Sequence, residues 1–469
     1  MVGFSKNFLW GRKQIALLST GFVENHPRFS YNKTPAFAEG AKGQLNFPKS
    51  FFWGSSTSAH QVEGGNHNDW TEWEAQSAKF KVESAKLKVW PDFILRNYPN
   101  PLQEENYISG RACDHYNRFH DDFDIAKSLG HNAHRFSIEW SRIEPEEGKF
   151  DEKEIEHYRE VIRSLRERGM EPFVTLWHWT HPVWFAKRGG WLHPQAEVSF
   201  LRFVERVVSE YKTDVRYWIT LNEPETFVRY GYLFGSQPPG SKNFFSALKV
   251  LKKLVEVHKS TYNLIHDLGG DKNVVGFAEG LVFFETYNRL PQNVILKYAL
   301  EFLRNMLFVP KVADTSDFIG LNYYFHSRVR LNPFVSQRWF QFNENKQVSD
   351  LGWEIYPEGL YRMLLSLKHY QKPIFITENG IADARDHYRA GFIRGHIQAV
   401  ERAIHDGVDV QGYFYWSLLD NFEIPRVDGF WPRFGLVEVD YKTLERKIRP
   451  SAYEYKKIIE ALKGEMGLM

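Results

Sequence analysis

Two glutamates occupy matching places in the chain, each directly behind an apolar stretch. Glu223 lies in the segment TLNEP (220–224) and Glu378 in the segment ITENG (376–380). Taken alone, either side chain would be interpreted as a helix cap or as the partner of an arginine. A pair of facing carboxyl groups is what glycoside hydrolysis needs, because one protonates the leaving oxygen and the other traps or stabilises an oxocarbenium-like centre. The pair therefore predicts catalysis by two carboxyl groups whose environments give them different proton affinities.

The elements that would position these glutamates alternate along the chain. Short apolar or aromatic runs are followed by longer amphipathic stretches, which is typical of βα units and a parallel sheet. The segment 151–168 illustrates the helices, with apolar residues at helical spacing from Ile155 to Leu165 and Gly169 as a stop. Eight strands are predicted, at residues 51–55, 133–138, 172–177, 216–221, 274–278, 317–323, 373–377 and 411–416.

Eight strands interleaved with helices predict an α/β fold of the closed (β/α)8 TIM barrel type. An open doubly wound sheet usually has fewer strands and a glycine-rich phosphate turn, and no GxGxxG follows any predicted strand. Catalytic residues of such barrels lie at the carboxyl ends of the strands. Strands four and seven would therefore bring Glu223 and Glu378 to the same face.

One barrel domain is predicted over residues 47–469, with long βα loops. An insertion at about residues 66–112, polar and rich in Trp, Pro and Asn, follows the first strand, where a loop would wall the active site. Residues 1–46 are interpreted as an N-terminal extension of uncertain structure. Within them, FSKNFLWG (4–11) echoes FPKSFFWG (47–54).

Composition narrows the class of partner. The formal net charge of +2 over 469 residues offers no electrostatic footprint for nucleic acid, so a small molecule is expected. The single Cys113 cannot form an internal disulfide, and the chain shows neither a signal peptide nor an apolar run long enough to span a membrane. We expect a cytoplasmic protein with no membrane partner; the sequence leaves a homo-oligomer open. Aromatic residues, at 16%, suit the C–H faces of sugar rings.

Seven segments carry a resemblance that covers nearly the whole chain from about Phe47. Together they resemble glycoside hydrolase family 1, the group of β-glucosidases and β-galactosidases. No single segment is specific for this family, but the occurrence of all seven in the family order is. The segments are FWGSSTSAHQVEGG (52–65), RFSIEWSR (135–142), LWHW (176–179), LNEP (221–224), DFIGLNYY (317–324), ITENG (376–380) and WSLLDNFE (416–423).

The resemblance implies roles for residues at the predicted reaction centre. Glu223 matches the general acid/base and Glu378 the nucleophile. Arg135 and Tyr324 resemble the groups that keep the nucleophile ionised and oriented, by charge and by hydroxyl donation. Asn222 resembles the residue that hydrogen-bonds the sugar 2-hydroxyl, a contact that strengthens in the transition state.

Further matching positions imply a binding site for the non-reducing sugar. Polar side chains would grip its hydroxyl groups and an indole would form the platform beneath it. These positions are Gln61, His178, Trp179, Asn322, Trp416 and Glu423. No HExxH or paired Cys/His cluster accompanies His178, so neither a metal nor a cofactor is expected.

The chain departs from the family pattern behind the WSLLDNFE segment. The family usually places a Trp there, whereas this chain has Ile424, and residues 425–433 run two residues longer. An Ile cannot donate the hydrogen bond of an indole, which leaves the choice among glucose, galactose, fucose and mannose configurations open. Trp431 is a candidate to supply the missing indole from the shifted loop, and Phe434 stands where the family pattern resumes.

The sequence predicts a retaining, exo-acting β-glycosidase. We expect β-glucosidase activity, accompanied by β-galactosidase or β-fucosidase activity, on terminal β-D-glycosyl residues of a small saccharide or glycoside, through a covalent glycosyl-enzyme. The alternatives are a transglycosidase and a catalytically silent glycan-binding protein. Arg426 and Arg433 leave a 6-phosphorylated sugar as a further alternative, although the Ser and Lys of relatives that bind such sugars are not found.

Overall fold

The computed structural model describes residues 47–331, 347–424 and 428–465. The predicted extension 1–46, with its FSKNFLWG segment, and Arg426 lie outside the described residues. Among the described residues, no helix is both long and apolar enough to cross a membrane.

Eight parallel strands close into a barrel, which confirms the predicted fold class. Going round the barrel the order follows the chain, and the last strand pairs with the first. The strands are β1 (Phe52–Ser56), β2 (Ala133–Ser137), β3 (Glu171–Trp177), β4 (Tyr217–Asn222), β5 (Val274–Gly280), β7 (Phe318–Asn322), β9 (Ile374–Asn379) and β10 (Val410–Trp416). The two-residue extensions of β5 and β9 beyond the predicted ends carry the sheet into polar residues.

Helices surround the barrel. The long helices are α5 (His115–Ser128), α7 (Glu152–Glu167), α9 (Ala196–Tyr211), α11 (Phe244–Gly269), α12 (Pro291–Asn305), α14 (Pro357–Leu367), α15 (Arg389–His405) and α16 (Pro450–Glu465). Helix α7 begins as its sequence predicts, because the Asp151 side chain accepts hydrogen bonds from the first-turn amides. It ends before Gly169, whose φ of +64° only glycine adopts without strain.

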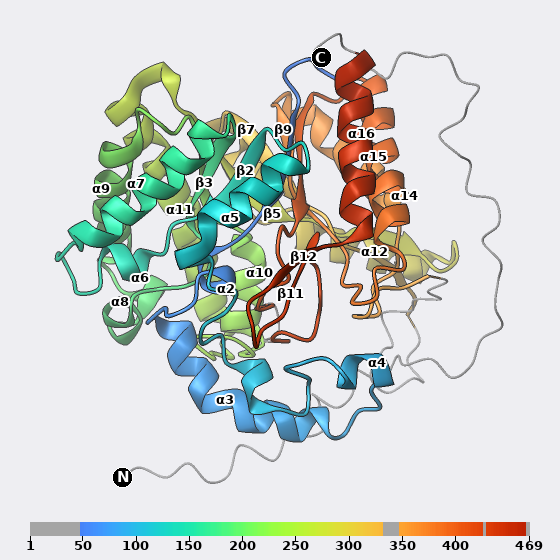
Figure 1. Ribbon diagram of the computed structural model, residues 1–469, viewed down its shortest axis with the longest axis horizontal. Coiled ribbons are helices and arrows are strands. Elements are labelled where there is room, and N and C mark those ends of the chain that lie inside the picture. Colours follow the sequence, from blue (N-terminus) through green and yellow to red (C-terminus); the bar gives the residue numbers. More distant parts are fainter. Residues whose placement is uncertain (1–46, 332–346, 425–427, 466–469) are drawn as a thin grey trace.

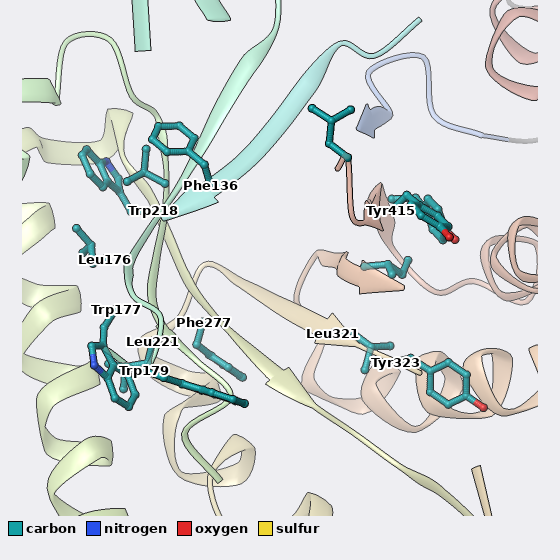
Figure 2. Packing of buried hydrophobic residues seen from close by; sticks show 14 of the residues in the cluster. Phe136, Leu176, Trp177, Trp179, Trp218, Leu221, Phe277, Leu321, Tyr323 and Tyr415 are labelled. Carbon is teal, nitrogen blue, oxygen red and sulfur yellow. The ribbon is translucent and has the colours of Figure 1, made fainter. Parts of the chain in front are cut away.

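The barrel interior is packed with aromatic rings. Phe173, Tyr217, Phe318, Phe375 and Phe414 form a buried cluster with small residues between them. A second, larger cluster fills the space between strands and helices. Figure 2 shows part of it, with Trp177 and Trp218 on one side of the view and Leu321 and Tyr323 on the other. The rings leave only the open ends of the barrel for a site.

The insertion after β1 is ordered around a helix that its sequence pattern did not predict. Helix α3 (Asp69–Ala85) follows α2 (Ala59–Val62), and α4 (Asp92–Leu95) and the 3₁₀ turn η1 (Glu104–Tyr107) complete the insertion. The Asn68 side chain caps α3 by accepting from the amides of Trp70 and Thr71. The buried face of α3 is narrow, and Trp70 is the only large aromatic residue on it. The apolar periodicity of the segment is therefore too weak to predict a helix.

Short elements gather at the carboxyl ends of the strands. They include α6 (Trp140–Ile143), α8 (Val183–Lys187), α10 (Pro224–Val228), the π-helical turn η3 (Arg229–Leu233) and α13 (Val309–Val312). Two small sheets, β6 (Phe283–Thr286) with β8 (His326–Val329) and β11 (Val437–Val439) with β12 (Arg446–Ile448), join them. In Figure 1, α2, α3, α10 and the β11–β12 pair lie below the labelled barrel strands.

Candidate active site

A hydrogen-bond chain joins the two glutamates at this end of the barrel. The Nδ2 of Asn322, on β7, donates to Glu223 Oε1 at 2.8 Å and to Asn222 Oδ1 at 3.1 Å. Arg135, on β2, donates to Asn222 Oδ1 at 2.7 Å and to Glu378 Oε1 at 2.5 Å. Asn322 is also the register partner of Glu378 on the neighbouring strand. The structure thus brings both glutamates to one network.

Both carboxylate oxygens of Glu378 have a strong donor. Arg135 holds Oε1 with a positive charge, and the Tyr324 hydroxyl donates to Oε2 at 2.7 Å. Arg135 is itself fixed by a bond from Nε to Thr175 Oγ1 at 3.1 Å. Charge-assisted bonds of this kind are stronger than neutral ones and stabilise the ionised form.

Glu223 has a different environment. Its side chain accepts hydrogen bonds from neutral groups, the amide of Asn322 and the hydroxyl of Thr226. Among the described residues, no ion pair within 4 Å joins it to a cation. Its backbone is left-handed, with φ of +44°, which is uncommon outside glycine and marks strain held by the surrounding structure. The turn aims the carboxyl group at Gly280, where a Cβ would lie 2.8 Å from it.

Burial raises the pKa of both carboxyl groups. The pKa of Glu378 rises to about 7, with Arg135 opposing the burial and Glu223 adding to it. The pKa of Glu223 also rises, again through burial, and Asn322 opposes this. Since Glu378 alone touches a guanidinium, it ionises first, and its negative charge then favours the protonated form of Glu223. The two carboxyl groups therefore favour different protonation states.

Two predicted sugar-binding residues lie in the same network. The Nδ2 of Asn222 is 3.2 Å from His178 Nε2, and no partner satisfies His178 Nδ1 among the described residues. Burial and the charge of Arg135 lower the pKa of His178 well below its usual value, so the ring is neutral. When Asn222 Nδ2 donates to Nε2, the single ring hydrogen of the neutral imidazole is on Nδ1. The Nδ1–H can then donate a hydrogen bond to a sugar hydroxyl group.

The His178 ring stacks on Trp416, with 6.1 Å between ring centroids. The Trp416 indole donates to Glu423 Oε1 at 3.1 Å, and burial raises the pKa of Glu423 to about 8. The amide of Gln61 donates to Asn421 Oδ1 and to the Phe422 carbonyl, at 2.9 and 2.8 Å. Gln61 is therefore held against the segment that leads to Glu423.

The remaining predicted residues are buried in supporting positions. The Trp179 indole donates to the backbone carbonyl of Asn222 at 2.9 Å, next to Glu223. The ring of Phe434 lies 6.1 Å from that of Tyr324. Trp431 packs edge-on against Trp90 of the insertion, with centroids 5.1 Å apart. The hypothesis that Trp431 supplies an indole to the sugar stays a prediction.

The segment that departs from the family pattern is well packed where it is described. Ile424 is buried in the main hydrophobic cluster. The Arg433 guanidinium donates to the carbonyls of Val439 and Tyr98, at 3.1 and 3.0 Å, and lies 3.5 Å from Asp420. These contacts hold the Arg433 guanidinium within the protein.

Sequence reasoning missed several supporting residues. Gly280 borders Glu223, Thr175 holds Arg135, and Thr377 donates to Asn322 Oδ1 at 2.7 Å. The threonines face inward on strands whose alternation could have identified them. In the described part of the chain, no group of acidic, His and Cys side chains is arranged to bind a metal ion.

The family profile described as glycosyl hydrolase family 1 matches residues 43–308 and 282–464. The chain belongs to glycosyl hydrolase family 1. Among curated members, a 1,4-β-D-glucan glucohydrolase of Thermotoga neapolitana is 32% identical over 88% of this chain and 98% of its own. The β-glucosidase A of Thermotoga maritima is 31% identical over the same shares.

Solved structures of family 1 members have the same fold. A β-glycosidase from Pyrococcus horikoshii is 36% identical, with a TM-score of 0.77 over 91% of this chain and 99% of its own. The T. maritima β-glucosidase in complex with glucoimidazole is 28% identical, with a TM-score of 0.78 over 89% and 99%. The family places this chain among glycoside hydrolases and confirms the resemblance seen in its motifs.

Proposed function

We propose that the protein is a retaining, exo-acting β-glucosidase with Glu378 as nucleophile and Glu223 as general acid/base. The observation that carries the proposal is the contrast between the two carboxyl groups. Arg135 and Tyr324 stabilise a negative charge on Glu378, whereas Glu223 is buried with a neutral amide. The β-glucosidase names of relatives and the glucoimidazole bound to one of them support a glucoside substrate.

In the first step, a Glu378 oxygen attacks the anomeric carbon while the bond from that carbon to the aglycone oxygen breaks. The proton of Glu223 passes to this oxygen, and the aglycone leaves as a neutral alcohol. The sugar is then an ester of Glu378. In the second step, Glu223 takes a proton from water, the water oxygen attacks the anomeric carbon, and Glu378 leaves as a carboxylate. Two inversions give net retention.

The other site residues bind the sugar or position the residues that do. We propose that Asn222, His178, Gln61 and Glu423 bind its hydroxyl groups and that Trp416 lies beneath the ring. Asn322 and Trp179 position Glu223 and the Asn222 backbone. The contact of Asn222 with the 2-hydroxyl would be strongest in the transition state, when the ring carries positive charge.

A chromogenic aryl glycoside panel tests the proposal. Wild-type protein should hydrolyse the β-glucoside, with the β-galactoside or β-fucoside next in kcat/KM. Glu378→Ala should abolish turnover, and Glu223→Gln should lower it by about 10²- to 10⁴-fold. No turnover on any glycoside of the panel would favour a silent glycan-binding protein, and a preference for a 6-phosphoglycoside would overturn the substrate assignment.

A further inference from the structure

Exposed apolar side chains are concentrated in one part of the molecule. Of the 20 large hydrophobic side chains that are exposed among the described residues, 12 lie between residues 233 and 306. We call them the apolar strip. It includes the end of η3, the first turns of α11 and the outer face of α12. Phe245, Ile295 and Tyr298 are the most exposed, at 72, 69 and 62%. Exposed apolar side chains gathered in such number usually mark a binding face.

Hydrogen bonds connect the parts of the strip. Arg229, the first residue of η3, donates to the Leu303 carbonyl of α12 at 3.4 Å. At the other end of the turn, the Asn243 amide donates to the Tyr232 carbonyl at 2.9 Å, just before α11 begins. The turn η3 therefore contacts both α12 and the segment that leads into α11.

The strip borders the catalytic face. The segment η3 follows α10, which begins directly behind Glu223 at the end of β4. Helix α12 follows β6, which extends the chain beyond the carboxyl end of β5. A surface that binds the strip would therefore face the same end of the barrel as the two glutamates.

The charges along the strip are basic. Residues 242–253 contain four lysines, of which Lys252 and Lys253 pair with Glu256 and Lys253 also pairs with Glu197. Residues 287–306 contain Arg289, Lys297 and Arg304 against Glu301 alone. Lys297 pairs with Glu301 at 3.0 Å. A second copy docking through the same strip would bring these cations together across a two-fold axis, at a cost in free energy. An anionic surface would be attracted.

We propose that the apolar strip seats the protein on an anionic lipid surface, with the open end of the barrel turned toward it. Phenyl rings and aliphatic side chains would enter the boundary between headgroups and acyl chains, Tyr298 would lie at headgroup depth, and the lysines would contact lipid phosphates. Binding of this kind is peripheral and needs no spanning helix.

Co-sedimentation of the full chain with lipid vesicles tests the proposal. The protein should pellet with vesicles of phosphatidylcholine and phosphatidylglycerol in equal parts, less with phosphatidylcholine alone, and less at high salt. Phe245→Ser combined with Ile295→Ser should weaken vesicle binding by about tenfold or more. The control, Val198→Ser combined with Tyr453→Ser, changes exposed apolar residues of α9 and α16 and should bind as wild type does.

Hydrolysis of a soluble aryl β-glucoside should be equal in all three proteins, which shows that the variants are folded and keeps this test separate from the catalytic one. No pelleting with anionic vesicles would overturn the proposal. So would a concentration-dependent dimer that the strip variant abolishes, since the occupant would then be a second copy. If the strip variant still binds vesicles and removal of residues 1–46 abolishes that binding, residues 1–46 rather than the apolar strip would be the lipid-binding segment.

Discussion

Glu223 and Glu378 are chemically identical side chains in different surroundings, and we propose opposite roles for them. Arg135 and Tyr324 bond to Glu378, while Glu223 accepts from the neutral amide of Asn322 and the neutral hydroxyl of Thr226. The proposed mechanism needs Glu378 ionised and Glu223 protonated. Activity should therefore rise with pH as Glu378 loses its proton and fall as Glu223 loses its own, with apparent pKa values that belong to the pair.

The variant Tyr324→Phe tests whether a single hydroxyl group helps to keep Glu378 ionised. Removing the donor at 2.7 Å destabilises the carboxylate form of Glu378, so its pKa rises further. The acidic limb of kcat/KM should move to higher pH, and the maximal kcat/KM should fall by about tenfold or more.

Tyr323→Phe is the matched control for this change. The neighbouring Tyr323 hydroxyl donates to the Tyr356 carbonyl at 2.9 Å and does not bond to Glu378. Its variant should keep the acidic limb in place. An unchanged limb in Tyr324→Phe would mean that the tyrosine packs in the site without supporting the charge.

From the sequence, the places of the two glutamates in the chain could be predicted more fully than the side chains that contact them. The glutamates stand at strand ends that apolar runs identify, whereas the roles of Arg135 and Tyr324 came from the resemblance to a family. Gly280 could not have been found, because its approach to Glu223 depends on how β4 and β5 are placed side by side.

Among the elements, β5 lies directly against the Glu223 carboxyl group. It runs two residues past its last apolar residue, Ala278, and ends at Gly280 beneath the Glu223 carboxyl group. A glycine at this place leaves room for that group without any unusual backbone.

Gly280→Ala should therefore displace Glu223 while the barrel stays folded. The new Cβ would lie 2.8 Å from the carboxyl group, and a displacement of that order should lower kcat by about 10- to 100-fold. Gly391→Ala, on an exposed turn of α15 with nothing within 4 Å of the added Cβ, is the control. Equal kcat in both variants would show that Glu223 has room to adjust.

All eight barrel strands could be predicted, because most are apolar or aromatic runs buried on both faces, and β1 and β2 begin with such residues. The ends of the strands could not be predicted, because polar residues such as Glu378 continue β9 beyond its apolar run. Helix α3 escaped prediction for a related reason. Its interior face is held by Trp70 and a buried Glu74 that bonds to His60 at 2.8 Å, which no periodicity of apolar residues reveals.

At the scale of the molecule, the family match begins at residue 43, close to the predicted start of the barrel at 47. We expect the chain without residues 1–46 to fold and to hydrolyse a soluble aryl β-glucoside with kcat/KM within about twofold of the full chain. Thermal unfolding and steady-state kinetics of the truncated chain measure this. A large loss of activity in a folded truncated chain would make the segment part of the site.

The account depends most on Glu378 forming a bond to the sugar. A 2-deoxy-2-fluoro-β-glucoside with a good leaving group should inactivate the protein by leaving a slowly hydrolysed ester, because fluorine destabilises the positive charge of the transition state. Mass spectrometry of the digested protein should then find one fluoroglucosyl group on the peptide that contains Glu378. A label on any other residue, or catalytic turnover without a trapped ester, would contradict the account.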